Sequence, residues 1–241
     1  MQLLRRALQP VTPDLVLFGC KRHYKPPAAP EHRTATVRER IPVGCYNHSM
    51  PPATAGYVLV GGRSSRFGSD KALLDWQGQP LALHVAEKVR EAAGSIALVG
   101  NPDRYQHLGL PLLPDPLLHH GPLAGLLAAL THTTSAWNLV VACDMPNLTT
   151  AFLSYLLETA QARNSDLLLP QDPQGRPEPL CAVYHHRCRE AIQTALAQGI
   201  HKMTEAFNRL RVHALPIQDP HLFANLNTPA DLPAGRSWPP R

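Results

Sequence analysis

The segment that most clearly indicates the fold is Tyr57-Val58-Leu59-Val60-Gly61-Gly62-Arg63-Ser64-Ser65-Arg66-Phe67-Gly68-Ser69-Asp70-Lys71. Its first four residues are apolar and run into two glycines, the pattern of a buried β-strand that enters a tight loop. After it, strand-length apolar runs alternate with helix-length amphipathic segments. Such alternation is typical of a mainly parallel sheet covered by helices on both faces. The sequence therefore predicts an α/β fold, a three-layer sandwich with a Rossmann-like sheet.

The predicted elements follow from apolar spacing. Leu81, Val85 and Val89 recur at helical intervals, and the segment that holds them stops at Gly94. By the same reasoning, helices are expected over residues 81–93, 123–130, 149–161 and 188–198. Strands are expected over residues 57–60, 96–99, 139–142, 167–169, 180–184 and 212–215.

Residues 1–56 differ from the rest in composition. They contain eight prolines and no sustained period of 2 or 3.6 residues, which indicates a disordered extension. An alternative is that translation starts at Met50 and that the preceding residues are an over-extended gene start. Eight basic and three acidic residues precede Gly56, whereas the remainder has fifteen of each. We therefore expect a basic extension (1–56), a neutral domain (57–235) that does not bind nucleic acid, and a short tail (236–241).

Several classes of protein are excluded by what the sequence lacks. No apolar run reaches the roughly 18 residues of a membrane helix, and prolines interrupt any N-terminal secretory signal. The five cysteines are dispersed without a paired spacing, which indicates reduced thiols and a cytoplasmic location. Adjacent histidines, as at His119-His120 and His185-His186, point apart and do not form a zinc motif.

The glycine loop after the first strand is the first candidate site. Gly61 and Gly62 let backbone N–H groups approach a phosphate closely, and Arg66 and Lys71 add cationic donors. The loop matches neither a P-loop nor the G-x-G-x-x-G dinucleotide motif. Gly-Gly alone would indicate a glycine-rich turn with solvated charges and no ligand. The Arg and Asp-Lys that follow favour a phosphate-binding loop instead.

Two acidic positions are further candidates. Asp144 follows the predicted strand 139–142, in the turn Cys143-Asp144-Met145-Pro146. Mg²⁺ is often held by one or two carboxylates together with substrate phosphates, so a single aspartate suits a metal–triphosphate site. Asp115 precedes a helix opened by Gly121, whose N-terminus presents unpaired N–H groups to an anion. Ligands of such sheets bind beyond the carboxyl ends of the strands, so we expect these groups to converge.

Taken together, these motifs resemble the molybdenum cofactor guanylyltransferase family. The family's opening Leu-Ala-Gly-Gly-x-Ser-x-Arg-Met-Gly-x-Asp-Lys is matched at residues 59–71, apart from Val60 and Phe67. The resemblance extends over residues 57–232 in the family's order. Its further motifs are Gly-Pro-Leu-Ala-Gly at 121–125, Cys-Asp-x-Pro at 143–146, Pro-Leu-x-Ala-x-Tyr at 179–184 and Asn-x-Asn-Thr-Pro-x-Asp-Leu at 225–232.

The resemblance implies a fold of the nucleotide-diphospho-sugar transferase type and transfer of GMP from GTP to Mo-molybdopterin. Mg²⁺ is the implied cofactor, Asp144 its ligand, and Asp144, Lys71 and Arg66 the catalytic groups. Molybdopterin-delivering and molybdoenzyme-maturation proteins are the implied partners. The implied nucleotide-binding residues are Leu59, Val60, Gly61, Gly62, Lys71, Asn101, Asp115 and Asp144, and Asn225 and Asn227 are implied on the pterin side.

The chemistry expected of this family needs no general base. A phosphate monoester is already largely dianionic at neutral pH, because its second pKa is about 6. Charge neutralisation and positioning then dominate catalysis. Two alternatives stay open: a cytidylyltransferase or another nucleotidyltransferase of the same fold, and a nucleotide-binding regulator without turnover.

Overall fold

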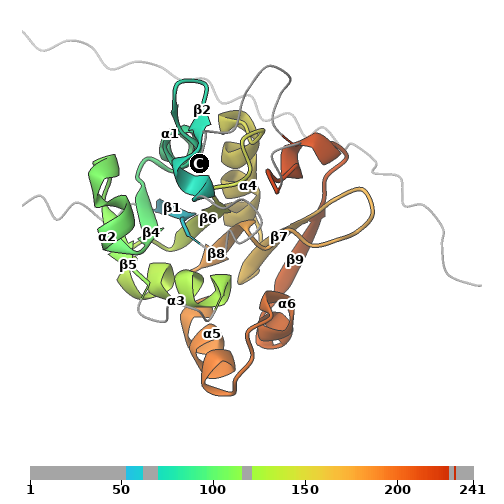
Figure 1. Ribbon diagram of the computed structural model, residues 1–241. Coiled ribbons are helices and arrows are strands. Elements are labelled where there is room, and N and C mark those ends of the chain that lie inside the picture. The colour runs from blue at the N-terminus through green and yellow to red at the C-terminus, as the bar shows by residue number, and fades with distance from the viewer. Residues whose placement is uncertain (1–52, 62–69, 116–120, 228–230, 232–241) are drawn as a thin grey trace, which may run out of the picture. The chain divides into compact units, whose positions relative to one another are not determined.

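The computed structural model describes residues 53–61, 70–115, 121–227 and 231 (Figure 1). All of them lie in one compact unit, His48–Arg241. Within it, a seven-stranded sheet has the order β5-β4-β1-β6-β8-β7-β9, and a small hairpin pairs β2 with β3. Neighbouring strands are parallel except where β8 pairs with β6 and with β7. The predicted α/β fold with a mainly parallel sheet is confirmed.

The strands are short and mostly buried. The longest, β1 and β6, pair in parallel from Thr54↔Trp137 to Leu59↔Ala142 and form the centre of the sheet. The bounds are β1 Thr54–Leu59, β2 Asp75–Trp76, β3 Gln79–Pro80, β4 Ala97–Gly100, β5 Leu112–Pro114, β6 Trp137–Ala142, β7 Leu167–Gln171, β8 Cys181–His185 and β9 Val212–Pro216.

Helices alternate with these strands. The α-helices are α1 Leu81–Ala93, α2 Pro102–Tyr105, α3 Pro122–His132, α4 Thr150–Ala162, α5 Cys188–Ala197 and α6 Met203–Ala206. Four 3₁₀ helices are described: η1 Lys71–Leu73, η2 Gln106–Leu108, η3 Phe207–Arg209 and η4 Pro220–Phe223. Among the described residues, no helix has both the length and the apolar character needed to cross a membrane.

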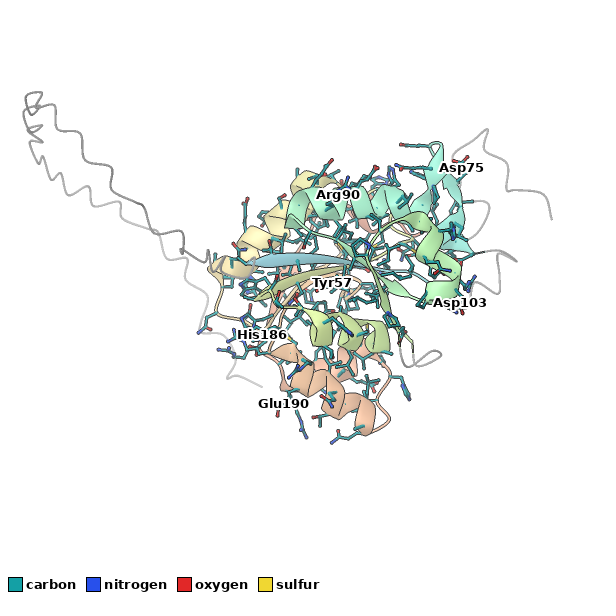
Figure 2. The ribbon with its side chains drawn as sticks, turned by 90° about the vertical axis from the view of Figure 1, so that its left-hand side faces the viewer. Tyr57, Asp75, Arg90, Asp103, His186 and Glu190 are labelled. Atoms are coloured by element: carbon teal, nitrogen blue, oxygen red, sulfur yellow. The ribbon has the colours of Figure 1, made fainter. Side chains whose placement is uncertain are left out.

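The sheet divides the core into two apolar layers. Side chains alternate along β1, so that Val58 packs with α1 and α4 while Tyr57 packs with α3 and α5. Figure 2 shows this arrangement, with Arg90 of α1 on one side of Tyr57 and Glu190 of α5 on the other. The same view places Asp103 and His186 at opposite ends of the sheet. The three-layer prediction therefore holds for the described unit.

The structure differs from the sequence prediction at β1 and β5, and it adds the hairpin β2–β3 and the short helices α2 and α6. β1 begins at Thr54, so the expected domain start at residue 57 falls inside the strand. β5 was not predicted, because Pro111 and Pro114 flank only two leucines and indicate a loop. As an edge strand, β5 tolerates proline, which cannot donate a ladder hydrogen bond. The remainder of the expected extension 1–56 and the tail 236–241 lie outside the described residues.

Candidate active site

A cavity of about 830 Å³ opens where β1, β4, β5 and β6 end. Its volume is in the usual range of ligand sites, roughly 300–1,000 Å³. Seven of the residues predicted to bind the nucleotide line it, namely Leu59, Val60, Gly61, Lys71, Asn101, Asp115 and Asp144. Gly62 and Arg66 lie outside the described residues. The seven lining residues therefore meet at the strand ends, where a ligand of such a sheet is expected.

Lys71 and Asp144 face each other in this cavity. The Lys71 Nζ lies 3.7 Å from the Asp144 Oδ2, and the two side chains are 18% and 25% exposed. Lys71 also donates a hydrogen bond to the Asn227 Oδ1 at 3.1 Å. The Lys71 amine therefore links the Asp144 carboxylate to a residue expected on the pterin side.

Backbone hydrogen bonds hold Asp144 in place. β6 ends at Ala142, and the next amide, of Cys143, donates to the Leu59 carbonyl at 3.2 Å. The Asp144 carbonyl in turn accepts a hydrogen bond from the Leu226 amide at 2.9 Å. The turn is therefore fixed on one side by β1 and on the other by the C-terminal segment.

The environment of Asp144 suits a cation. Burial raises the pKa of its carboxyl group, and the Lys71 ammonium opposes that shift. A partly desolvated carboxylate gains from any added positive charge. Among the described residues there is no group of three or more His, Cys, Asp or Glu side chains that could hold a metal ion. A hard ion such as Mg²⁺ would thus need substrate oxygens as further ligands, and this donor set fits an ion that enters with phosphates.

Two glycines allow the close approach of chain segments around the cavity. Gly61 has φ +105°, a conformation that L side chains rarely adopt. At Gly100, a Cβ atom would lie 2.5 Å from the Val60 carbonyl oxygen. The cavity wall between β1 and β4 therefore has no space for a side chain at residue 100.

Of the other predicted residues, Asn101 and Asp115 line the cavity and Asn225 does not. Asn101 caps α2, because its Oδ1 accepts a hydrogen bond from the Asp103 amide at 2.9 Å. Asp115 follows β5, and its amide donates to the Gly100 carbonyl at 3.3 Å. Asn225 is half-buried and does not line the cavity, although its Oδ1 atom is buried without a hydrogen-bond partner.

Asp70, Arg104 and Tyr105 are among the cavity residues that had no role assigned from the sequence. The Asp70 carboxylate accepts a hydrogen bond from the Tyr105 hydroxyl at 2.6 Å and forms an ion pair with Arg104. The Asn101-Pro102 pair is a helix-start signal that indicates α2. No local pattern connects that helix to Asp70.

Cys143 also lines the cavity but is not a suitable nucleophile. Burial raises the pKa of its thiol, with Asp144 and Asp70 adding to the shift. The reactive thiolate form is thereby disfavoured.

Comparison with known families identifies one match. The MobA-like NTP transferase domain matches residues 56–213. A probable molybdenum cofactor guanylyltransferase from Nostoc sp. is 35% identical over 181 residues, which cover 73% of this chain and 86% of the relative. One of the same description from Deinococcus radiodurans is 36% identical over 183 residues, covering 76% and 93%.

Solved structures agree with this match. Molybdopterin-guanine dinucleotide biosynthesis protein A from Archaeoglobus fulgidus superposes with a TM-score of 0.64 at 29% identity, covering 73% of this chain and 94% of that one. A CMP:2-keto-3-deoxy-manno-octonic acid synthetase complexed with CTP superposes with a TM-score of 0.56 at 13% identity, covering 73% and 94%. The second likeness concerns the fold alone. The predicted nucleotide-diphospho-sugar transferase type of fold is confirmed.

Proposed function

The chain belongs to the family of MobA-like NTP transferases, and we propose that it transfers GMP from GTP to the terminal phosphate of Mo-molybdopterin. The products are Mo-molybdopterin guanine dinucleotide and pyrophosphate. The observation that carries the proposal is the Lys71–Asp144 pair in a cavity at the strand ends. The descriptions of the relatives supply the identity of the nucleotide and of the acceptor.

In the proposed reaction, an oxygen of the acceptor phosphate bonds to the α-phosphorus of GTP. The bond from that phosphorus to the oxygen that bridges to the β-phosphate breaks, and pyrophosphate leaves with the electron pair. No proton has to be removed from the acceptor when its phosphate is dianionic. The main barrier is then repulsion between two anions, and a cationic side chain fixed in the cavity lowers it.

Lys71 is the described cation best placed for this role. Its amine is held between the Asp144 and Asn227 side chains, so little reorientation is needed when phosphates enter. Preorganised charge of this kind acts strongly in a site that excludes water. We also propose that Asp144 holds Mg²⁺ together with phosphate oxygens. Bound there, the ion would neutralise phosphate charge that Lys71 alone does not balance.

The nucleotide would lie along the edge formed by β1 and β4. Gly61 lines the cavity at the end of β1, and Asn101 and Asp115 line it after β4 and β5. We propose that Leu59 and Val60 border the base and ribose, that Asp115 assists nucleotide binding and that Asn225 and Asn227 face the pterin. Arg66 is expected to add charge at the phosphates.

The cellular compartment is inferred from the cysteines, and the partner proteins are inferred from the substrate and product. Cys143, Cys181 and Cys188 are free thiols buried in the fold, which favours a reducing compartment, and we propose the cytoplasm. The substrate Mo-molybdopterin and its product both have to be handed over. Proteins that deliver molybdopterin and mature molybdoenzymes are the proposed partners.

A pyrophosphate-release assay tests this function directly. The purified chain is mixed with Mo-molybdopterin, Mg²⁺ and either GTP, ATP or CTP. We expect release with GTP that depends on the acceptor, together with formation of the guanine dinucleotide. Release with CTP alone would identify a cytidylyltransferase. GTP binding without release from any nucleotide would identify a regulator.

A further inference from the structure

The Asp70 carboxylate lies at the cavity edge and uses both of its oxygens. Its Oδ1 accepts a hydrogen bond from the Ala72 amide at 3.1 Å, and its Oδ2 accepts one from the Tyr105 hydroxyl at 2.6 Å. Arg104 forms an ion pair with the same Oδ2. Only 9% of the Asp70 side chain is exposed. The carboxylate is therefore held in one position by donors from two elements.

The first of these contacts concerns Lys71 directly. Asp70 is the N-cap of η1, and Lys71 is the first residue of that helix. A cap side chain fixes the backbone of the first helical turn by accepting one of its unpaired N–H groups. The direction in which the Lys71 side chain leaves the backbone therefore depends on where the Asp70 carboxylate is held.

The second contact comes from a residue that is itself fixed. Tyr105 is wholly buried, and its ring lies against two glycines of the cavity wall. A Cβ atom added at Gly61 would lie 3.4 Å from the Tyr105 hydroxyl oxygen, and one added at Gly100 would lie 3.2 Å from the Tyr105 Cδ2. Burial raises the pKa of the Tyr105 hydroxyl, and the hydrogen bond to Asp70 adds to the shift. The hydroxyl thus remains a proton donor over the working pH range.

We propose that Tyr105, assisted by Arg104, is a positioning residue that acts through Asp70 to hold the Lys71 amine at the phosphate-binding end of the cavity. Residues of α2 contact Asp70, Asp70 caps η1, and η1 begins with Lys71. Because α2 is also capped by Asn101, the same short helix joins the expected nucleotide-binding wall to the catalytic lysine. This inference rests on the proposed function, since it assumes that Lys71 binds the triphosphate.

If Tyr105 had a purely structural role, a different effect on nucleotide binding would be expected. A buried tyrosine that only packs α2 affects stability, and its effect on nucleotide binding does not depend on residue 71. A positioning residue loses its effect once the group that it positions is gone. A double-mutant cycle between Tyr105→Phe and Lys71→Met separates the two roles. Phe removes only the hydroxyl, and Met keeps most of the length of the lysine side chain without its charge.

The cycle is measured by the Kd of the Mg²⁺–GTP complex and, where turnover remains, by kcat/KM. We expect Tyr105→Phe to weaken GTP binding about tenfold, the scale of one hydrogen bond to a charged group. In the Lys71→Met background, the same change should alter the Kd less than about twofold. Equal losses in the two backgrounds would overturn the inference, and so would an unchanged Kd in Tyr105→Phe.

Tyr184→Phe is the matched control. Tyr184 is also wholly buried, and its hydroxyl donates to the Pro179 carbonyl at 2.7 Å. Its side chain packs with α5 and η3 rather than at the cavity. Both variants should lower Tm to a similar extent, but only Tyr105→Phe should weaken GTP binding. Similar losses of GTP affinity in both would contradict the positioning role.

Arg104→Met provides a second, independent variant. The Arg104 side chain is half exposed, so its ion pair with Asp70 is screened by salt. We expect a loss of GTP affinity of less than about fivefold at low salt, and that loss should vanish near 0.5 M NaCl. A loss independent of salt would argue against action through Asp70. If the unmodified chain bound no GTP, the proposed function itself would fail. That outcome differs from equal effects of Tyr105→Phe in the two backgrounds, which would overturn only the positioning role.

Discussion

The Leu226 amide donates a hydrogen bond to the Asp144 carbonyl at 2.9 Å, so a segment near the C-terminus is joined to the turn that carries the proposed metal ligand. The next residue, Asn227, accepts a hydrogen bond from Lys71 through its side chain. Its amide donates to the Asp231 carboxylate at 2.7 Å. The Lys71–Asp144 pair and the proposed pterin side of the site are therefore parts of one hydrogen-bonded unit.

Asn227→Ala removes the acceptor that Lys71 uses in this unit. We expect kcat/KM for Mo-molybdopterin to fall about tenfold, because a hydrogen bond to a charged group is lost beside the acceptor. The Kd for GTP should change less. Asn147→Ala is the control, since Asn147 also joins the turn to the C-terminal segment, through the His221 carbonyl at 3.1 Å. An equal loss in both variants would contradict a substrate-facing role of Asn227.

The cavity wall predicts a larger loss of stability for one glycine substitution than for another. Gly100→Ala places a methyl group against the Val60 backbone, and overpacking of this kind costs about 1–3 kcal/mol of unfolding free energy. At Gly125 the nearest neighbours of an added Cβ are the Leu59 and Val99 side chains, at 3.3 and 3.8 Å. Alanine also favours a helix by about 1 kcal/mol over glycine. The stability of Gly125→Ala should change by less than about 1 kcal/mol. Urea unfolding of both variants measures this contrast, and equal destabilisation would refute it.

The pH dependence of stability should depend on Asp166. Hydrogen bonds from Arg211 lower its pKa to about 2, so the folded carboxyl group titrates below the unfolded one. Its contribution is then fully present above the unfolded pKa of about 3.9 and is lost as the pH falls towards 2. Asp166→Asn should lose about 1–3 kcal/mol at pH 7.

Urea unfolding of both proteins at pH values between 7 and 3 tests this sign. The difference in unfolding free energy should be constant above about pH 5 and should shrink below pH 4. A difference that grew on acidification would contradict the assignment. Asp172→Asn is a poorer choice for the test, because Asp172 lies in the loop beside Arg176 and not between two elements.

Lys88 of α1 also contacts the turn that carries Asp144, through the Pro146 carbonyl. The Lys88 Nζ donates to the Pro146 carbonyl at 2.8 Å and lies 2.8 Å from the Nε2 of His84. Lys88→Met should lower the apparent affinity for Mg²⁺ in turnover about tenfold, as the loss of outer-shell support does at metal sites. Arg90→Met, on the exposed side of α1 (Figure 2), should leave it within about twofold. An unchanged Mg²⁺ dependence in Lys88→Met would remove this role.

The sequence predicted the sheet because buried parallel strands leave continuous apolar runs, as at residues 139–142. Asp144 was located by its position after such a run. The contacts of Asp70 with Tyr105 and of Lys88 with Pro146 were not predictable, since they join residues 35 and 58 positions apart. Such contacts depend on how strands and helices pack. Local periodicity carries no information about that packing.

In the proposed mechanism, Asp144 and Lys71 together neutralise the phosphates during transfer. The most direct test of this mechanism is the rate of GMP transfer to Mo-molybdopterin by Asp144→Ala at saturating Mg²⁺ and GTP, with circular dichroism to confirm folding. Removing one preorganised electrostatic group should lower kcat at least about 100-fold. A folded Asp144→Ala variant that transfers GMP at a near-normal rate would contradict the account.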